Sequence, residues 1–423
     1  MHYPEVYYNI TPMATSNPPG RAGRYVRQST GYRAFIPSPL PPEPPIQISR
    51  ELADALSQAG LAIGRLDGAS GILPNPDLFV GMYVRQEAVL SSQIEGTQAS
   101  LVDLLDYEVN EQNAQAPRDV EEVVNYVNAM NYGLRRLADL PLSLRLLREI
   151  HGQLMSGVRG QEREPGEFRH SQNWIGPAGS TLNSASFVPP PPHEMGQALG
   201  DLERFLHERE HPALLRAGLV HAQFETIHPF LDGNGRVGRL LITFMLCEQQ
   251  VLSRPLLYLS HYLKLHRAEY YDRLQAVRTD GRWEEWLLFF LLGVRQVADQ
   301  AVATARQIIS LRESHRALLL QQGQSSGNML RALDLLFRQP ILTVSFLSEQ
   351  LRMTFGGANN MANRLVQLGI VKEVTGNRRN RRFAYDDYVR LFRDLDLVNG
   401  ETEQAGTDET QLQLPVDPTT NSR

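Results

Sequence analysis

Residues 228–239 read HPFLDGNGRVGR and separate two apolar stretches that have the periodicity of helices. A glycine-rich loop that opens a helix presents free backbone N–H groups and the positive end of the helix dipole, and its glycines let an anion approach closely. The loop lacks the Gly-Lys-Ser/Thr ending of a P-loop, so the positive charge must come from Arg236 and Arg239. Their spacing places both arginines on roughly one face of the helix. The stretch therefore predicts a phosphate-binding loop.

Two titratable residues of this loop predict its chemistry. Asp232 is interpreted as the N-cap of the following helix, as a ligand for a Mg²⁺ ion that bridges phosphates, or as both. A calcium loop is disfavoured, because Arg236 stands where calcium would need an oxygen. His228 is interpreted as a general base, with a structural histidine that ends a helix as the alternative. A metal at His228 would need further ligands, and His221, one histidine upstream, could share its helical face.

The composition narrows the functional class. The 423 residues are 42% hydrophobic and 21% charged, as expected for a globular protein of two or three domains. A net charge of -5 argues against wholesale coating of nucleic acid. We find no export signal and no apolar stretch approaching the roughly 18 residues of a membrane span, so we expect a cytoplasmic protein with no membrane partner. Cys247 is the only cysteine, which excludes an internal disulfide.

Periodicity and composition divide the chain into six parts. Ser49 is a plausible N-cap of a first helix, and Gly96 is the expected C-cap of a second. Near residue 327 the pattern changes to three short helices followed by two short strands with a basic turn, the order of a winged helix-turn-helix. The expected parts are an extended proline-rich arm (1–48), an N-terminal helical domain (49–140), a helical core (141–300), a linker helix (301–326), a winged helix-turn-helix (327–396) and a disordered tail (397–423).

The loop and its surroundings resemble the Fic (filamentation induced by cAMP) family. Its signature HPFx[DE]GNGRxxR is matched at every defined position, and PGEFR at 165–169, NWIG at 173–176 and FVPPPP at 187–192 are similar to the sequences around it. The resemblance covers roughly residues 33 to 395. It implies an all-α fold with a Fic-fold helical core, a small β-hairpin flap, an N-terminal helical extension and a C-terminal winged helix-turn-helix.

The resemblance implies transfer of AMP from ATP to a hydroxyl of a target protein or of the chain itself. His228 would deprotonate that hydroxyl, Asp232 would hold Mg²⁺, and Arg239 would meet the γ-phosphate. The residues expected to bind the nucleotide are Asp232, Gly233, Asn234, Gly235, Arg236, Val237, Gly238, Arg239 and Tyr271. Tyr271 is equally compatible with a core position, and Arg278 replaces an asparagine that touches adenine in some relatives, which puts that contact in doubt.

A second motif, SSQIEG at 91–96, places Glu95 at the end of a predicted helix, where the helix dipole disfavours a carboxylate. A cation elsewhere should therefore compensate it, unless it is a solvated surface residue. Ser91, Glu95 and Gly96 match the inhibitory motif [ST]xxxE[GN] of the Fic family. The resemblance implies that Glu95 pairs with Arg239 and keeps the γ-phosphate from seating productively. In some relatives the same glutamate supports removal of AMP, and the sequence leaves both roles open.

Two alternatives concern partners. The stretch from Trp174 to Phe187 would place a strand edge beside the loop, able to hold a target segment, or would merely cover the pocket. The basic wing, Arg378–Arg382, and the helix carrying Asn359, Asn360 and Asn363 would suit DNA phosphates and base edges. A DNA-binding regulator with a nucleotide-sensing core, a deAMPylase and a transferase of another phosphate-containing group are therefore the alternative functions. Relatives often dimerise, so a homodimer is a further expectation.

Overall fold

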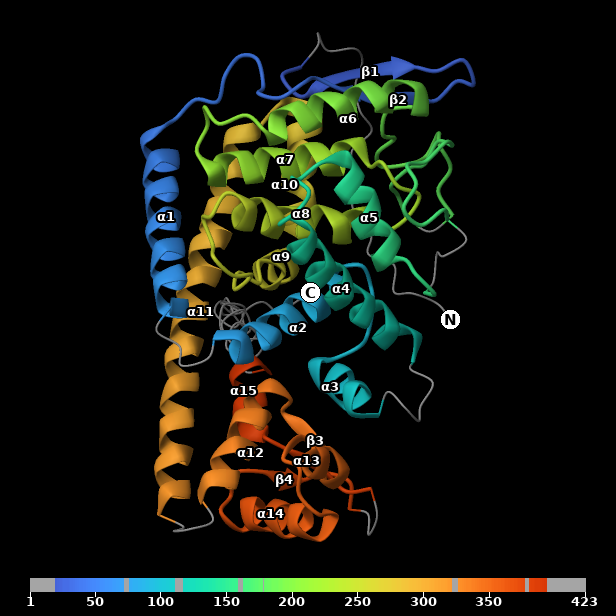
Figure 1. Cartoon of the computed structure of the whole chain (residues 1–423). Coiled ribbons are helices and arrows are strands. Elements are labelled where there is room, and N and C mark those ends of the chain that lie inside the picture. Colours follow the sequence, from blue (N-terminus) through green and yellow to red (C-terminus); the bar gives the residue numbers. More distant parts are fainter. Residues whose placement is uncertain are drawn as a thin grey trace, which may run out of the picture.

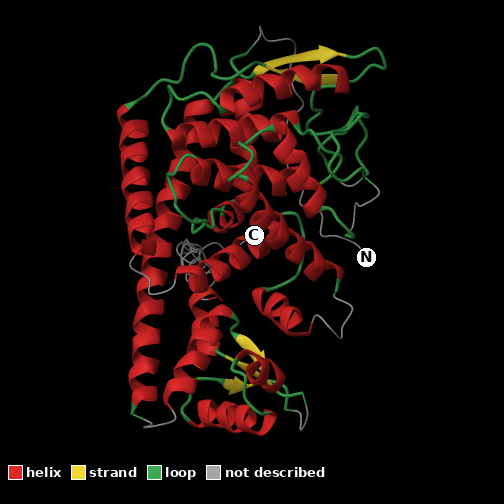
Figure 2. Ribbon diagram, viewed as in Figure 1, coloured by secondary structure: helices red, strands yellow, loops and turns green. Residues whose placement is uncertain are grey.

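The computed structural model describes residues 20–71, 76–110, 117–158, 163–177, 179–321, 326–376 and 380–393. Helices dominate these residues, with one small sheet at each end of the chain (Figures 1 and 2). The predicted all-α architecture is therefore confirmed in its main feature. The sheet near the N-terminus is the departure from it, whereas strands were expected in the C-terminal module.

The first sheet corrects the expectation of an extended arm. Strands β1 (Gly23–Arg27) and β2 (Arg33–Pro37) pair antiparallel within the segment predicted to be proline-rich and extended. The rings of Tyr25 and Phe35 pack edge to face across the pair at 5.1 Å, and Phe35 is buried. Because each strand is only five residues long, its alternation is easily missed beside the prolines that follow it. Residues 1–19 of the predicted arm lie outside the described residues.

The described residues from 50 to 154 form five helices. They are α1 (Arg50–Gly71), α2 (Pro76–Ile94), α3 (Leu101–Asn110), α4 (Arg118–Arg136) and α5 (Leu144–Leu154). The Ser49 hydroxyl accepts a hydrogen bond from the Leu52 N–H at 3.2 Å, so the predicted N-cap of α1 is confirmed. Gly96 has φ +100° just beyond α2, as expected for the residue that ends a helix.

The core helices are α6 (Pro192–Leu206), α7 (Ala213–Ile227), α8 (Asn234–Glu248), α9 (Ser260–Leu265), α10 (Arg267–Asp280) and α11 (Trp283–Leu320). Helix α7 is buried from Leu214 to Ile227, and α8 is buried along most of its length. A helix buried on all sides is the most rigid place a fold offers, because every side chain is in contact. The loop between α7 and α8 is therefore held by the two central helices of the molecule.

Helix α11 corrects one expectation and bears on a second. The boundary predicted between residues 300 and 301 falls inside this 38-residue helix, so the core and the linker helix are continuous. By length and composition alone α11 would also suffice to cross a membrane, contrary to our reading of the sequence. Its apolar window is 61% buried, however, and α1 packs along its side (Figure 1). Burial against protein explains the apolar composition of α11.

The C-terminal module comprises α12 (Ser326–Arg338), β3 (Ile341–Thr343), α13 (Val344–Gln350), α14 (Phe355–Gln367), β4 (Lys372–Glu373), β5 (Arg382–Ala384) and α15 (Asp386–Arg393). The strands form an antiparallel sheet in the order β3-β5-β4. The expected helices and strands are present, and β3 and α15 are additions that the sequence did not suggest. The assignment of this module as a winged helix-turn-helix stays a prediction. Residues 394–396 and the predicted tail lie outside the described residues.

Only some of the residues predicted to contact DNA are both described and exposed. Asn360 is exposed on α14, whereas the Asn363 side chain accepts a hydrogen bond from Arg381 at 2.6 Å. Asn359 is partly buried, and Arg378 and Arg379 lie outside the described residues. DNA binding therefore stays a prediction.

The C-terminal module packs against α2, the helix that leads to Glu95. The Gln86 side chain donates a hydrogen bond to the Phe392 carbonyl at 3.4 Å, and the rings of Tyr83 and Phe392 meet edge to face at 5.3 Å. Arg382 pairs with Asp106 of α3 at 3.2 Å. One face of α2 thus belongs to the interface with the C-terminal module.

Candidate functional site

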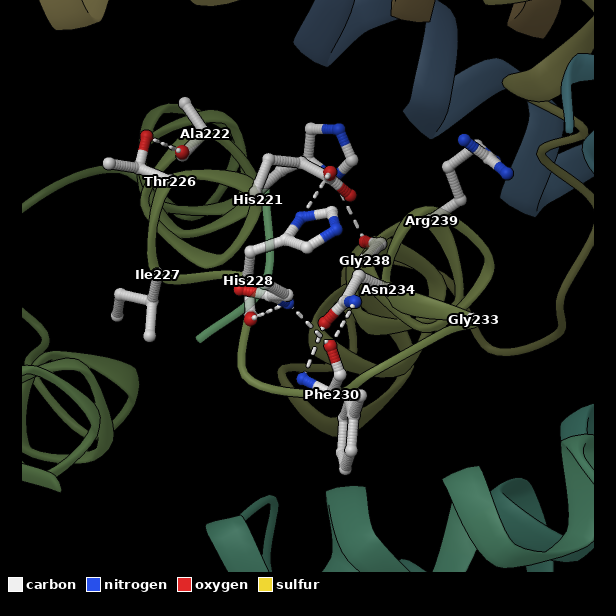
Figure 3. Close-up of polar contacts among 12 residues, drawn as sticks. His221, Ala222, Thr226, Ile227, His228, Phe230, Gly233, Asn234, Gly238 and Arg239 are labelled. Carbon is white, nitrogen blue, oxygen red and sulfur yellow. Dashed lines mark hydrogen bonds and ion pairs between the residues drawn. The ribbon is translucent and has the colours of Figure 1, made fainter. Parts of the chain in front are cut away.

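Two left-handed residues bracket the loop between α7 and α8. His228 ends α7 with φ 49° and ψ 61°, and Gly233 begins α8 with φ 75° and ψ 3°. Such a conformation costs little at glycine and more at histidine, so the surroundings must hold His228 in place. Figure 3 shows the His228 ring at the end of α7, facing the start of α8.

The backbone of the loop is fixed from within. The Asn234 side chain accepts a hydrogen bond from the Phe230 N–H and donates one to the Phe230 carbonyl, both at 2.8 Å (Figure 3). The His151 ring stacks on Phe230 at 3.8 Å, accepts from the Gly166 N–H through Nδ1, and therefore donates through Nε2 to the Asp232 carbonyl at 3.1 Å. The Asn234 side chain is thus structural, and only its backbone N–H remains for a phosphate.

His228 is anchored through its carbonyl, not through its ring. Arg169 donates to that carbonyl at 3.0 Å and Asn173 at 3.2 Å. Burial, with Arg278 and Arg169 nearby, lowers the pKa of the His228 imidazole to about 3, so the ring is neutral at physiological pH. A neutral imidazole can accept a proton. A ring that hydrogen-bonds only the backbone stays the alternative: Nδ1 has no hydrogen bond of good geometry among the described residues, but the Glu225 backbone acts on the imidazole and raises its pKa slightly against burial.

His221 does not join His228 in a metal site. Its Nδ1 lies 2.9 Å from the Gly238 carbonyl and its Nε2 lies 2.8 Å from the Tyr270 hydroxyl. Both nitrogens are therefore engaged inside the core. The structure contains no group of three or more His, Cys, Asp or Glu side chains able to hold a metal, as far as the residues it describes can tell.

Asp232 stands at the mouth of the loop. The N-cap interpretation is wrong, because Gly233 occupies that position and caps the helix with no side-chain bond, while Asp232 accepts from the Gly233 N–H at 2.6 Å. The Asp232 side chain is 36% exposed, 3.9 Å from both Arg163 and Arg236. One accessible carboxylate beside a helix terminus fits Mg²⁺, which proteins usually hold through one or two carboxylates together with phosphates and water.

The two arginines of the loop have different partners. Arg236 is buried and pairs with Glu122 of α4 at 3.2 Å, with Met155 Sδ at 3.5 Å. Arg239 donates to the Ser91 hydroxyl at 2.8 Å, to the Ser91 carbonyl at 3.1 Å and to Glu95 Oε1 at 2.6 Å. The pairing of Glu95 with Arg239, inferred from the resemblance, is present in the structure.

The Glu95 carboxylate lies over the start of α8. Burial would raise its pKa, but Arg239, followed by Arg236 and His228, outweighs burial and lowers it. A β-carbon at Gly235 would collide with Glu95 Oε1. The Glu95 carboxylate therefore remains charged at neutral pH and occupies space directly above a glycine of the predicted phosphate cradle.

A buried network behind Glu95 was not predicted from the sequence. Glu87, two helical turns earlier on α2, accepts hydrogen bonds from the Tyr126 hydroxyl at 3.1 Å and from the Ser260 N–H at 3.0 Å and hydroxyl at 2.5 Å. Burial raises the pKa of Glu87 to about 7. The network attaches α2 to α4 and α9. No local signal marked Glu87 as buried, because its neighbours Arg85 and Gln86 are polar as well.

The other residues expected near the nucleotide lie in different surroundings. The Val237 side chain is fully buried in the core, so only its backbone can face a nucleotide. Tyr271 is partly buried, 5.0 Å from the Tyr270 ring and with Arg267 over its face, which does not decide between adenine contact and packing. Arg278 donates to the Glu225 carbonyl at 3.0 Å and lies 4.1 Å over the Phe187 ring. It therefore braces the end of α7.

The predicted flap is shorter than a hairpin. Ile175 and Phe187 exchange two backbone hydrogen bonds, at 2.8 and 3.0 Å, as an isolated antiparallel pair. The prolines that follow Phe187 cannot donate ladder hydrogen bonds, which explains why the pairing stops there. Residue 178 of the turn lies outside the described residues.

Removing the Glu122 carboxylate should destabilise the fold by about 3–5 kcal/mol, because Arg236 would be left buried without its partner. We expect the loss as a lower midpoint of urea unfolding for Glu122→Ala. Glu149→Ala is the matched control, since its carboxylate pairs with Arg136 and Arg145 where solvent screens the charges, so we expect little change in the midpoint. Equal losses in the two variants would contradict this account of Arg236.

The sequence of this chain matches models of known protein families and known proteins. Residues 53–135 match the model described as Fic/DOC family N-terminal, and residues 141–246 match that of the Fic/DOC family. The chain is 33% identical over 139 residues to a protein adenylyltransferase Fic from Aedes aegypti, covering 32% of this chain and 24% of that protein. It is 29% identical over 182 residues to a probable protein adenylyltransferase from Aquifex aeolicus, covering 41% of this chain and 51% of that protein.

The alignments thus span between a quarter and about half of the length of these curated relatives. Among solved structures, a Fic family protein from Desulfovibrio desulfuricans G20 superposes with a TM-score of 0.53 at 20% identity. The superposition covers 81% of this chain and 97% of that one. At this identity the likeness establishes the fold.

Proposed function

This chain belongs to the Fic/DOC family, and from the geometry of its loop we propose that it transfers AMP from ATP to a hydroxyl of a protein, itself included. The observation that carries the proposal is a neutral, anchored His228 at the entrance of an anion-binding helix terminus. The names of the curated relatives support the same reaction.

In this mechanism His228 takes the proton of the target hydroxyl as the hydroxyl oxygen attacks the α-phosphorus, and pyrophosphate leaves. The first N–H groups of α8 have no acceptor within the helix and face the phosphates, where the helix dipole favours negative charge. Arg236, held by Glu122, and Arg239 add positive charge. Positioning and charge neutralisation are the main requirements of phosphoryl-type transfer.

A Mg²⁺ ion held by Asp232 would neutralise charge on the phosphates. The remaining contribution of this chain is orientation. Arg169 and Asn173 fix the His228 backbone, and Asn234 fixes the turn that follows it.

Inhibition by Glu95 is part of the proposal. Its carboxylate occupies Arg239, which is the residue expected to bind the γ-phosphate, and it lies over Gly235. An anionic phosphate cannot share that position with a charged carboxylate. The resting chain would therefore hold ATP poorly or in an unproductive pose. Support of AMP removal by Glu95 is the second candidate, favoured by its carboxylate remaining within the same site.

ATP labelled at different phosphates tests the reaction class. Glu95→Gly protein incubated with Mg²⁺ should incorporate label from the α-phosphorus, and label from the γ-phosphorus should appear in pyrophosphate. Incorporation is measured on the denatured protein, and intact mass should show the addition of AMP. Label from the γ-phosphorus on the protein would instead indicate phosphate transfer and would refute AMP transfer.

A further inference from the structure

A buried carboxylate faces His228 from the preceding turn of α7. Glu225 Oε2 lies 4.0 Å from His228 Nδ1, and the Glu225 side chain is only 8% exposed. The second oxygen, Oε1, is buried without a hydrogen bond among the described residues, as is His228 Nδ1. Leaving buried polar atoms without hydrogen bonds costs free energy, so the placement of these two groups side by side requires an explanation.

Helix α8 leaves room for this carboxylate. A β-carbon at Gly238 would collide with Glu225 Oε1. Residue 238 is a variable position of the loop signature, so the signature itself does not demand glycine there. Glycine at position 238 is explained by the Glu225 side chain, which occupies the space between α7 and α8 where a β-carbon would lie.

We propose that Glu225 is a positioning residue for His228, holding the imidazole through its Nδ1–H and offsetting the positive charge that the ring gains during AMP transfer. The inference rests on the proposed function. In the reaction the target O–H bond breaks and an N–H bond forms at the other ring nitrogen, while the target oxygen bonds to phosphorus and pyrophosphate leaves with the electron pair of the broken P–O bond. Glu225 touches none of the reacting atoms and acts through the imidazole, as the acid of a Ser-His-Asp triad does.

The charge of Glu225 changes in the neutral pH range. Burial raises the pKa of this carboxyl to about 7; Arg239 and Arg278 oppose that rise, and Glu95 adds to it. The remaining charged and titratable groups that face the pair are Tyr270 and Tyr271 on α10 and Arg169 beside the flap.

The sign of the pH dependence follows from these charges. The His228 imidazole stays neutral through the neutral range, because its pKa is lowered to about 3. Below the pKa of Glu225 the carboxyl is neutral and cannot offset an imidazolium. Above it the carboxylate strengthens His228 as a base. The contribution of Glu225 to the rate is therefore present at high pH and lost as pH falls through that pKa.

The test compares Glu95→Gly with Glu95→Gly/Glu225→Gln at saturating ATP and Mg²⁺, from about pH 5 to about pH 8.5, because loss of the Glu95 charge lowers the pKa of Glu225. We expect kcat to fall at least about tenfold at the upper pH, with the KM for ATP little changed. The ratio of the two rates should rise with pH, and ionisation of ATP cancels in that ratio. Glu95→Gly/Glu248→Gln is the matched control, since Glu248 also has a buried oxygen without a hydrogen bond but accepts from the Leu142 N–H.

A second measurement needs no transfer activity. In histidine-labelled protein without nucleotide, the NMR resonance of the His228 ring should shift in the neutral range as Glu225 ionises, and Glu225→Gln should remove that step. A pH-independent ratio together with no step would reduce Glu225 to a packing role and overturn the inference. Absence of transfer by Glu95→Gly protein would reject the proposed function alone, because the resonance still decides the role of Glu225.

Discussion

Glu95→Gly protein should attach AMP to itself at least about tenfold faster than the wild-type chain. The change frees Arg239 from a 2.6 Å charge-assisted hydrogen bond, an interaction worth roughly 1.5–3 kcal/mol, or about a ten- to hundredfold change in an equilibrium constant. It also clears the space above Gly235. The initial rate of label incorporation from the α-phosphorus of ATP measures the gain.

The matched control is Asp139→Gly, which removes an exposed acid just beyond the end of α4. It should leave the rate unchanged, because it faces no arginine of the loop. Glu95→Gln adds a graded case, since the amide keeps the size of the side chain and loses its charge. If Glu95→Gly labels no faster than Asp139→Gly, occupation of Arg239 is not what limits the resting chain.

His228→Ala in the Glu95→Gly chain should lower incorporation by about a hundred- to ten-thousandfold, the usual range for loss of a general base. ATP binding should survive, because the hydrogen bonds from Arg169 and Asn173 reach the carbonyl of residue 228 and not its ring. Binding is measured by calorimetry with the same proteins.

The left-handed backbone at residue 228 calls for a second variant. Alanine at φ 49° would be strained, whereas asparagine adopts this conformation readily. His228→Asn therefore removes the base with less strain and should be equally inactive. Substantial labelling by His228→Asn would show that another group takes the proton, and the assignment of His228 would fall.

The sequence predicted the loop at residues 228–239 better than it predicted the distant residues that hold the loop in place. The glycines and arginines of residues 228–239 predicted a turn followed by a helix, and α8 begins there, while binding of an anion by this turn stays a prediction. Asp232 was misassigned as a possible N-cap, because Gly233 can adopt the left-handed conformation that begins α8.

The groups that hold the site come from distant segments. Glu122 lies more than a hundred residues before Arg236, and Arg169 reaches the His228 turn from the flap region. Nothing in the local pattern distinguishes such a buried acid or arginine from a solvated one, since both sit in helical or irregular stretches with ordinary spacing. Only packing shows that Glu225 points into the protein rather than to solvent.

Helix α2 is bound on two sides, by Arg239 and the Glu87 network at the active site, and by Phe392 of the C-terminal module. The free energy needed to withdraw Glu95 therefore includes contacts on both sides of one rigid element. Linked equilibria are reciprocal. If a ligand of the C-terminal module prefers one position of α2, it changes the affinity for ATP by some factor, and ATP changes the affinity for that ligand by the same factor. If Glu95 inhibits as proposed, its withdrawal and binding at the C-terminal module are parts of one thermodynamic cycle.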